Sequence, residues 1–278
     1  MKSTTLQLEV QQISTIQDLT GIFESIASLR IARVKDKVAT SQLFFDELWS
    51  IYSQLRVDAA TAASVSGGIK RDKANVFLVL TGQGSLSGDI DERIIRSVME
   101  NYDAKTTDLV VIGAHGTTLL AQQKAYAKHT FKLPDSDDGI DVGPIVEALS
   151  GYANPTVYYQ KYVSLAVQVT DKINLFHRVQ ALGSDSTGQN LITPRDYLFE
   201  PSTKEVVGYL ESVMLEIALG QVILESRLAQ YASRFSAMSA AHKKAQELEV
   251  AADLNFHRAK RLESDERLKE VIVAMDIA

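Results

Sequence analysis

The chain has 278 residues, and 29 Lys and Arg against 35 Asp and Glu give it a formal net charge of −6. The absence of cysteine excludes disulfides, cysteine nucleophiles and cysteine-based zinc sites, and the mild acidity argues against a non-specific nucleic-acid-binding protein. No uncharged apolar run approaches the ~18 residues of a membrane span, and the first residues lack the apolar core of a signal peptide. We therefore expect a cytoplasmic globular protein.

The N-terminal segment, residues 1–66, reads as one long helix. It contains a single glycine, Gly21, and no proline. Apolar residues recur at steps of three and four, which is the spacing of one helical face; they include Leu6, Val10, Ile13, Ile16, Leu19 and Phe23. The pattern predicts a helix from about Thr4 to Val57, roughly 80 Å long at 1.5 Å per residue.

The middle of the chain, residues 67–195, alternates between strand and helix patterns. Apolar runs predict buried strands at Val76–Leu80 and Leu109–Ile112, a short strand at His129–Lys132, and one or two longer strands within Thr156–Val169. Amphipathic segments predict helices at Ile90–Tyr102, Thr117–Lys128 and Ile145–Leu149, and the polar stretch Ala181–Asn190 predicts a mobile loop. This order indicates a mostly parallel sheet with helices on its faces.

The C-terminal segment, residues 196–278, predicts a second and longer helix. From Ser202 onward it has two glycines and no proline, and its apolar residues follow a heptad-like seam. Ser202 and Glu205 have the spacing of a capping box. A helix from there to about Ala274 would be on the order of 110 Å long, so it must pair with the N-terminal helix or enter a partner.

Two motifs in the middle segment bear on chemistry. The turn Gly82–Gly88 follows a strand and opens a helix, but its G-x-G-x-x-x-G spacing is not that of a dinucleotide loop, and no Gly-Lys-Ser/Thr follows. A glycine-rich turn is the simpler reading, with nucleotide binding as the alternative. The acidic cluster Asp135, Asp137, Asp138 and Asp141 lacks the glycine and glutamate positions of a calcium loop, which favours a solvated loop.

The five histidines give little indication of a catalytic or metal site. None forms a metal-spaced pair, and only His115, directly after a strand, is placed as a catalytic group would be. His242 and His257 fall on the long C-terminal helix, where a seam or surface role is the default. We therefore expect no catalytic residue, no cofactor and no metal.

Three segments resemble a known family. Leu80–Asp91 aligns without gaps with I-T-S-D-R-G-L-C-G-G-L-N, matching at Thr81, Leu86 and Gly88. Tyr197–Ser202 is similar to Y-x-F-E-P-S, and Leu215–Glu270 keeps the spacing of the family's last helix. On these residues the chain resembles the gamma subunit, or central stalk, of rotary F-type ATP synthases over nearly its whole length.

The departures from the family pattern indicate a divergent member. Where the family's first helix reads K-N-T-Q-K-I-T-K-A-M, this chain keeps Gln17 and Thr20 but has Asp18 and Gly21 at two lysine positions. The D-R-G of the turn becomes Gln83-Gly84-Ser85, and the family's C-terminal basic and polar positions fall on Lys260-Arg261 and Asp265–Arg267.

The resemblance implies an α/β fold: a long antiparallel coiled coil of the N- and C-terminal helices plus a central Rossmann-like domain with a mostly parallel sheet. It implies a non-catalytic rotor that transmits torque between a catalytic hexamer of alpha and beta subunits and a membrane-side ring or other driven element, coupling ion translocation to ATP synthesis or hydrolysis. An epsilon-like subunit is a further implied partner. Gln17, Thr20, Lys260 and Arg261 are the implied hexamer contacts. The implied location is peripheral, at the cytoplasmic face of the membrane or the matrix side of an organelle.

Two other classes of protein remain as alternatives. A non-rotary coiled-coil scaffold would show no affinity for an alpha/beta hexamer. A nucleotide-dependent enzyme built on residues 67–195 would bind a ligand that a Gly84→Val or Gly88→Val variant could not bind.

Overall fold

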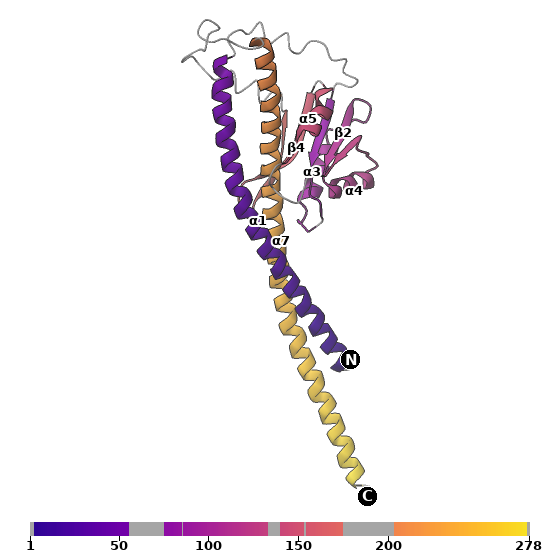
Figure 1. Ribbon diagram of the computed structural model, residues 1–278. Helices are drawn as coiled ribbons and strands as arrows, with labels where there is room; N and C mark the ends of the chain where they lie inside the picture. Colours follow the sequence, from indigo (N-terminus) through magenta and orange to yellow (C-terminus); the bar gives the residue numbers. More distant parts are fainter. Residues whose placement is uncertain are drawn as a thin grey trace. The chain divides into compact units, whose positions relative to one another are not determined.

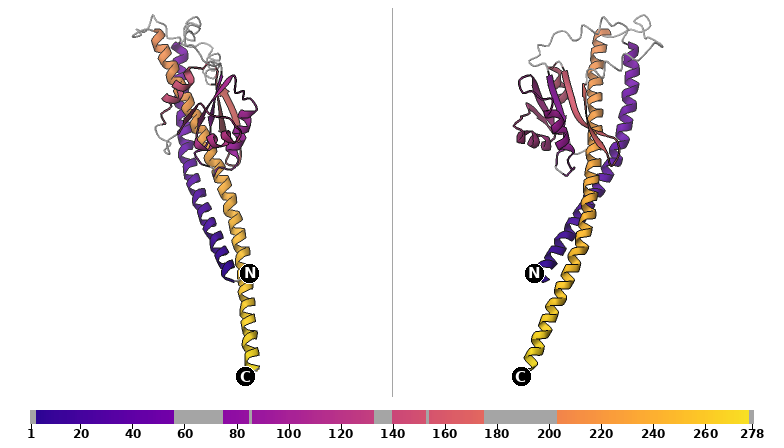
Figure 2. Two further views of the ribbon diagram at one scale, coloured as in Figure 1. Left: turned by 90° about the vertical axis from the view of Figure 1, so that its right-hand side faces the viewer. Right: turned by 180° about the vertical axis from the view of Figure 1, so that it is seen from behind.

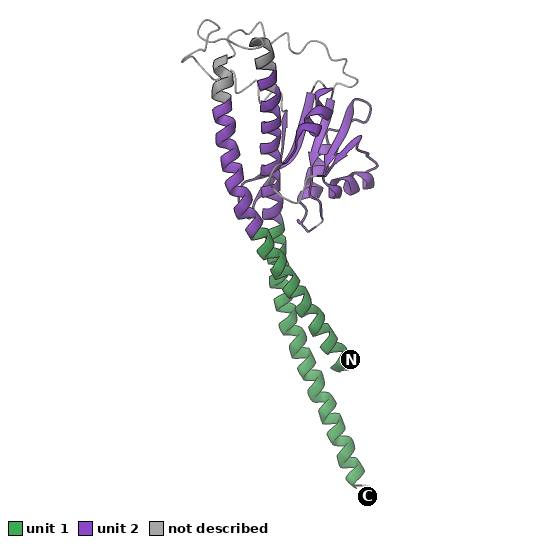
Figure 3. Cartoon of the chain, viewed as in Figure 1, with its two compact units in different colours: residues 1–28, 234–278 green, residues 29–233 purple. Residues whose placement is uncertain are grey.

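The computed structural model describes residues 3–55, 75–84, 86–132, 140–152, 154–174 and 203–276. The chain divides into two compact units (Figure 3): residues 1–28 with 234–278, here named the coiled-coil unit, and residues 29–233, here named the α/β unit. Both long helices contribute to both units. The boundaries expected after residues 66 and 195 lie outside the described residues, so the three-part division stays a prediction.

Two long helices begin and end the described chain (Figure 1). Helix α1 is Ser3–Leu55, with 53 residues, and α7 is Thr203–Asp276, with 74 residues. The long helices expected from the apolar spacing and the scarcity of glycine and proline are therefore confirmed. Ser202, the expected helix cap, lies outside the described residues, as does the expected loop Ala181–Asn190.

The α/β unit contains a five-stranded sheet in the order β3-β2-β1-β4-β5. Its strands are β1 (Asn75–Leu80), β2 (Thr107–Ile112), β3 (His129–Phe131), β4 (Asn154–Tyr162) and β5 (Gln168–Asn174). Strand β1 is parallel to β2 and β4, and β2 is parallel to β3, whereas β5 is antiparallel to β4. The mostly parallel sheet is confirmed, and the apolar stretch Thr156–Val169 divides between two strands.

Both faces of the sheet are covered, which explains the continuous apolar runs of β1 and β2. Alternate residues of a strand point to opposite faces, so β1 divides its side chains between two cores. On one face, Phe77 and Val79 pack with α3 (Ile90–Met99) and α4 (Ala114–Gln122). On the other, Val76, Leu78 and Leu80 pack with α5 (Gly143–Ser150) and α7.

The ends of three helices differ from the sequence-based expectation: α5 extends the expected Ile145–Leu149 by a residue or two at each end, and α3 and α4 differ more. Helix α3 ends at Met99 instead of Tyr102, and α4 occupies Ala114–Gln122 instead of Thr117–Lys128. The backbone after α4 explains its early end: Lys124 has a φ of 58°, in the left-handed region, so the helix cannot continue through it. At the other end, Gly113 has a φ of 104°, and the chain turns there directly from β2 into α4.

Helix α7 lies along the sheet in the α/β unit (Figures 1 and 2). Met214, Leu219 and Ile223 are fully buried in the same core as β1 and β4, and Phe45 of α1 joins this core. No helix among the described residues combines the length and apolar character that crossing a membrane requires.

Candidate functional site

The helices of the coiled-coil unit lie antiparallel and close together. Ser3 Oγ donates to Glu263 Oε2 at 2.6 Å, and His242 Nδ1 lies 2.9 Å from the backbone oxygen of Gln17. Small side chains are buried in this unit, namely Ala27, Ala245 and Ala252. Short side chains allow two helix backbones to approach closely, which suits a slender paired shaft.

Gly21 makes room for His242. A Cβ at Gly21 would lie 3.3 Å from both Cε1 and Nδ1 of the imidazole, so the ring rests against the bare backbone of α1. Because a carbonyl oxygen can only accept, Nδ1 must carry the proton and donate to Gln17 O. His242 therefore lies in the seam between the two helices, which is one of the two roles, seam or surface, expected from its place on the helix.

The four residues expected at the hexamer contact all lie in the coiled-coil unit, but in two different environments. Gln17 and Thr20 are half-buried; Oε1 of Gln17 is buried without a hydrogen-bond partner among the described residues, and Oγ1 of Thr20 donates to the carbonyls of Ile16 and Gln17. Lys260 and Arg261 are exposed, and Lys260 Nζ lies 5.8 Å from the centre of the Phe256 ring.

The two pairs are not brought together. Gln17 lies opposite His242, and Lys260 is a further 18 residues along α7 (260 − 242 = 18), or about 27 Å along the helix axis. The coiled-coil unit therefore presents two separate polar positions, one near Gln17 and one near the N-terminal end of α1, where Ser3 meets Glu263.

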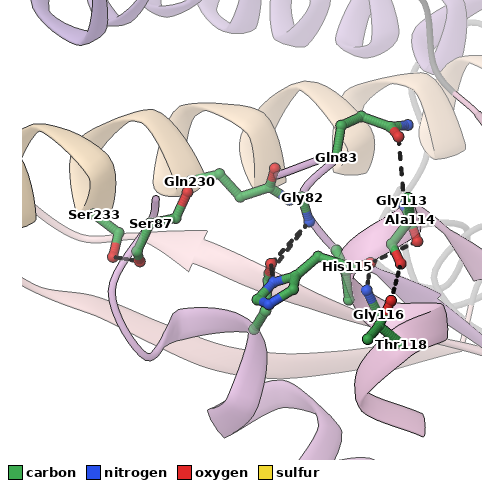
Figure 4. A network of polar contacts seen from close by, with 12 residues as sticks. Gly82, Gln83, Ser87, Gly113, Ala114, His115, Gly116, Thr118, Gln230 and Ser233 are labelled. Carbon is green, nitrogen blue, oxygen red and sulfur yellow. Dashed lines mark hydrogen bonds and ion pairs between the residues drawn. The ribbon is translucent and has the colours of Figure 1, made fainter. Parts of the chain in front are cut away.

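The glycine turn after β1 is closed by a carboxylate of the chain itself (Figure 4). The backbone N–H of Gly82 donates to Asp91 at 3.1 Å, and His115 Nδ1 lies 2.8 Å from Asp91 Oδ2. Asp91 is 1% exposed. A phosphate bound at such a turn would need the N–H group that Asp91 already accepts from, and would meet its negative charge. This geometry does not favour the nucleotide-binding alternative, and it gives His115 a buried carboxylate as partner.

Gln160 links this turn to α7. Its Nε2 donates to Leu80 O and to Asp91 Oδ1, both at 2.9 Å, while its Oε1 accepts from Ser226 Oγ and from Gln230 Nε2. Sequence analysis missed Gln160, Ser226 and Gln230. No local signal could have found them, because Gln160 is 69 residues from Asp91 and 66 from Ser226 along the chain.

Two glycines allow β1 and β2 to meet at their carboxyl ends. Thr81 Oγ1 donates to Ile112 O at 2.8 Å and accepts from Gly116 N at 3.1 Å. A Cβ at Gly113 would lie 2.2 Å from Thr81 O, and one at Gly116 would lie 2.3 Å from Thr81 Oγ1. Thr81 can therefore lie against both positions only because neither carries a side chain.

The opposite end of the sheet is held by a lysine, a tyrosine and an aspartate. Lys128 Nζ lies 2.9 Å from Tyr152 OH and 3.0 Å from Asp108 Oδ2, and Tyr152 OH donates to Asp108 at 2.7 Å. The hydrogen bonds to Tyr152 and Asp108 raise the pKa of Lys128, and burial raises the pKa of Tyr152. Burial also raises the pKa of Tyr158. These contacts brace three segments, and none has the form of a catalytic site.

The other polar residues singled out in the sequence make only local contacts where the structure describes them. Asp141 Oδ1 accepts from the backbone N–H of Gly143 at 3.0 Å, as residues before a helix commonly do. Asp135, Asp137 and Asp138 lie outside the described residues. His257 is exposed and faces Asp253 on its own helix at 3.5 Å. Within the described ranges, no three metal-binding side chains come together.

Comparison with known proteins agrees with the resemblance. Residues 3–276 match the family model described as ATP synthase. The ATP synthase gamma chain of Mesoplasma florum is 22% identical over 275 residues, covering 94% of each chain, and that of a Wolbachia endosymbiont of Drosophila simulans is 25% identical over 282 residues, covering 96% of each.

Solved structures share the fold. A chain in the cryo-EM structure of Euglena gracilis mitochondrial ATP synthase, in the part containing OSCP, F1 and the c-ring, matches with a TM-score of 0.66 at 16% identity, over 98% of this chain and 94% of that chain. A chain in the central stalk and c-ring of Tetrahymena thermophila mitochondrial ATP synthase matches with a TM-score of 0.58 at 16% identity, over 80% of this chain and 99% of that chain. With the family model spanning nearly all its residues, the chain belongs to the ATP synthase family, among the gamma chains.

Proposed function

We propose that this chain is the central-stalk rotor of a rotary ATPase, and that it catalyses no chemical step itself. In this role the coiled-coil unit turns inside a hexamer of alpha and beta subunits, and the α/β unit engages an epsilon-like subunit and a membrane-side ring or other driven element. Membership of the gamma-chain family supports the proposal, as do the matched chains from complexes that contain F1 and the c-ring.

The observation that carries the proposal is the apolar surface of the coiled-coil unit. Large apolar side chains remain exposed on α1, among them Leu8, Ile16, Leu19, Ile22 and Ile26. A monomeric soluble protein rarely leaves so many apolar side chains open along one element, and such surfaces usually mark an interface. A hexamer that surrounds the shaft would cover them.

Exposed apolar side chains at the C-terminal end of α7 also indicate an interface with a partner. Helix α1 begins at Ser3, which contacts Glu263, and α7 continues to Asp276. Beyond this contact Leu268, Ile272 and Met275 are exposed, Met275 by 75%. A single helix with apolar side chains is marginal in water, so this end needs a partner to bury it.

Torque transmission requires different faces of one shaft to meet identical subunits in turn. The exposed surface of the coiled-coil unit is not uniform, because it carries apolar side chains such as Ile16 and Leu19 on α1 and the charged Lys260 and Arg261 on α7. Each orientation would favour a different conformation of a neighbouring beta subunit, and differential affinity of this kind shifts conformational populations. The nucleotide chemistry would then belong to the hexamer.

We assign the hexamer contact to Gln17, Thr20, Lys260 and Arg261. Lys260 and Arg261 are exposed and so available to acidic groups of a partner. Gln17 and Thr20 are half-buried, and the Thr20 hydroxyl already bonds its own helix, so they would contribute mainly through the surface of α1 around them. The chain would then be peripheral, at the cytoplasmic face of the membrane or the matrix side of an organelle.

Native mass spectrometry of the tagged full chain, purified from its own cells, tests this function. The expected particle holds one copy of the chain with three copies each of two nucleotide-binding subunits. A chain lacking residues 254–278 is the comparison: it should lose hexamer subunits, while the α/β unit unfolds at an unchanged temperature because none of the deleted residues belongs to it.

Two outcomes would contradict the proposal. A monomer or homodimer without nucleotide-binding subunits, under conditions that keep other complexes intact, would favour a coiled-coil scaffold. Equal recovery of the hexamer with the full and the shortened chain would show that the end of α7 is not the part inserted.

A further inference from the structure

Helix α7 contacts the sheet through two different kinds of surface. From Met214 to Ile223 the contact is apolar. From Ser226 to Ser233 it is polar: Ser226 and Gln230 bond to Gln160 of β4, and Ser233 bonds to Ser87 in the turn after β1. Apolar contact is non-directional and can repack when a helix shifts, whereas hydrogen bonds hold only over a narrow range of distance and angle. The polar surface is therefore the part able to define the position of α7.

Gln160 is the centre of the polar surface, and its orientation is determined. The side chain is 0% exposed, and both ends of the amide are used. Its Nε2 faces two acceptors, Leu80 O and the Asp91 carboxylate, and its Oε1 faces the donor groups of α7. A flipped amide would place oxygen against a carbonyl and a carboxylate, so only one orientation satisfies the network.

A second hydrogen bond ties α7 to a different segment of the chain. Ser233 Oγ donates to the backbone oxygen of Ser87 at 2.6 Å, in the turn between β1 and α3 (Figure 4). Ser226, Gln230 and Ser233 are spaced by four and three residues, so they share one face of the helix. A slip of α7 by one residue would rotate this face by about 100° and break every one of these bonds.

We infer that Gln160, with Ser226, Gln230 and Ser233, sets the rotational and axial register of the α7 segment 214–233 on the sheet within the α/β unit, and that force passes between this segment and the sheet through this network. Gln160 is a positioning residue in this role. The inference rests on the proposed rotor function for its mechanical part, while the register itself is a property of the isolated chain. Gln160, Ser226 and Ser233 are buried and Gln230 is half-buried, so a broken member leaves polar groups with little access to water, and this resists slippage.

The test compares Gln160→Met with Gln168→Met in the full chain. Gln168 is a matched control, because it is also a buried glutamine of the sheet but bonds to Ser164 O and Leu165 O in the β4–β5 turn and not to α7. Ser226→Ala is a milder second variant, which removes the two hydrogen bonds of Ser226 Oγ, to Gln160 and from Gln230, and keeps Gln160 in place.

The first measurement is hydrogen exchange of the α7 segment 224–236 in the isolated chain. Gln160→Met should accelerate exchange there by about 5- to 150-fold, which corresponds to about 1–3 kcal/mol of lost hydrogen bonding, and Gln168→Met should not. Ser226→Ala should give a smaller change in the same segment. Unchanged exchange in both Gln160→Met and Ser226→Ala would overturn the register role, whatever the function of the chain.

The second measurement is coupling in the complex reconstituted into vesicles, as the membrane potential formed per ATP hydrolysed. Gln160→Met should lower this ratio while the hydrolysis rate and subunit composition stay as in the wild type. An equal fall with Gln168→Met would refute the mechanical part. If the wild-type chain forms no complex, the proposed function fails, and the exchange measurement still decides the register.

Discussion

Replacing Gly116 with alanine should destabilise the α/β unit, because the new methyl group would overlap Thr81. An ideal Cβ at Gly116 would lie 2.3 Å from Thr81 Oγ1, 2.6 Å from its Cγ2 and 2.9 Å from its Cβ. Thr81 cannot turn away without loss, because the same Oγ1 donates to Ile112 O and accepts from Gly116 N. The turn that begins at Gly82, and that Asp91 of α3 closes, follows Thr81 directly.

The expected magnitude comes from three terms. Overpacking costs about 1–3 kcal/mol. Loss of the two hydrogen bonds of Thr81 Oγ1 adds about 0.5–1.5 kcal/mol each. The better helix propensity of alanine returns about 1 kcal/mol, because Gly116 lies in α4. The net loss in the free energy of unfolding is then about 1–5 kcal/mol, a large share of the stability of a typical domain.

Urea denaturation followed by circular dichroism would measure this loss. Gly151→Ala is the control, since a Cβ there would meet nothing within 4 Å. The decisive variant is Gly116→Ala combined with Thr81→Ala, which removes the two nearest overlapping atoms. If the overlap is the cause, Gly116→Ala should cost at least about 1 kcal/mol less in that background. Additive effects, or a Gly116→Ala variant as stable as Gly151→Ala, would refute the reasoning.

Two further substitutions test one hydrogen-bonded contact in the α/β unit and one in the coiled-coil unit. Tyr152→Phe should lower the free energy of unfolding by about 1–1.5 kcal/mol, because the hydroxyl bonds a lysine and an aspartate, whereas exposed Tyr126→Phe should change little. Because folding raises the pKa of Tyr152, the unfolded chain loses the hydroxyl proton at a lower pH than the folded chain does. The free energy of unfolding of the wild type, measured by urea titration, should therefore fall more steeply than that of Tyr152→Phe between about pH 9 and pH 11. His242→Ala should remove about 1 kcal/mol from the free energy of unfolding and so lower the thermal unfolding temperature. Replacing the exposed His257 with alanine should leave that temperature unchanged. A pH profile of Tyr152→Phe parallel to the wild type, or equal effects of the two histidine variants, would count against these assignments.

Features that depend on neighbouring residues were readable from the sequence. Helices α1 and α7 follow from apolar spacing over 53 and 74 residues with few helix breakers, and β1 and β2 follow from unbroken apolar runs. The family followed from local motifs such as the turn Leu80–Asp91. Each of these signals is repeated or contiguous, so a single chain read from end to end contains it.

Features that depend on residues far apart in the sequence could not be predicted from it. The ends of α4 were misjudged because backbone conformation at Gly113 and Lys124, not side-chain pattern, decides them. Gln160 and Ser226 looked like ordinary polar residues of a strand and a helix, yet they are buried and bonded to each other. The sequence does not indicate whether the hydrogen-bond partner of a polar side chain is water or a group 66 residues away.

The sequence by itself thus determined which segments are helix and strand, the mostly parallel sheet, and the gamma-chain family, because local periodicity and contiguous motifs encode these. Only the tertiary structure decided that Asp91 closes the glycine turn, that Gly21 admits His242, and that a buried amide joins the sheet to α7. Those arrangements are selected by burial, where most polar groups must find a hydrogen-bond partner within the protein, and burial is a property of the packed chain alone.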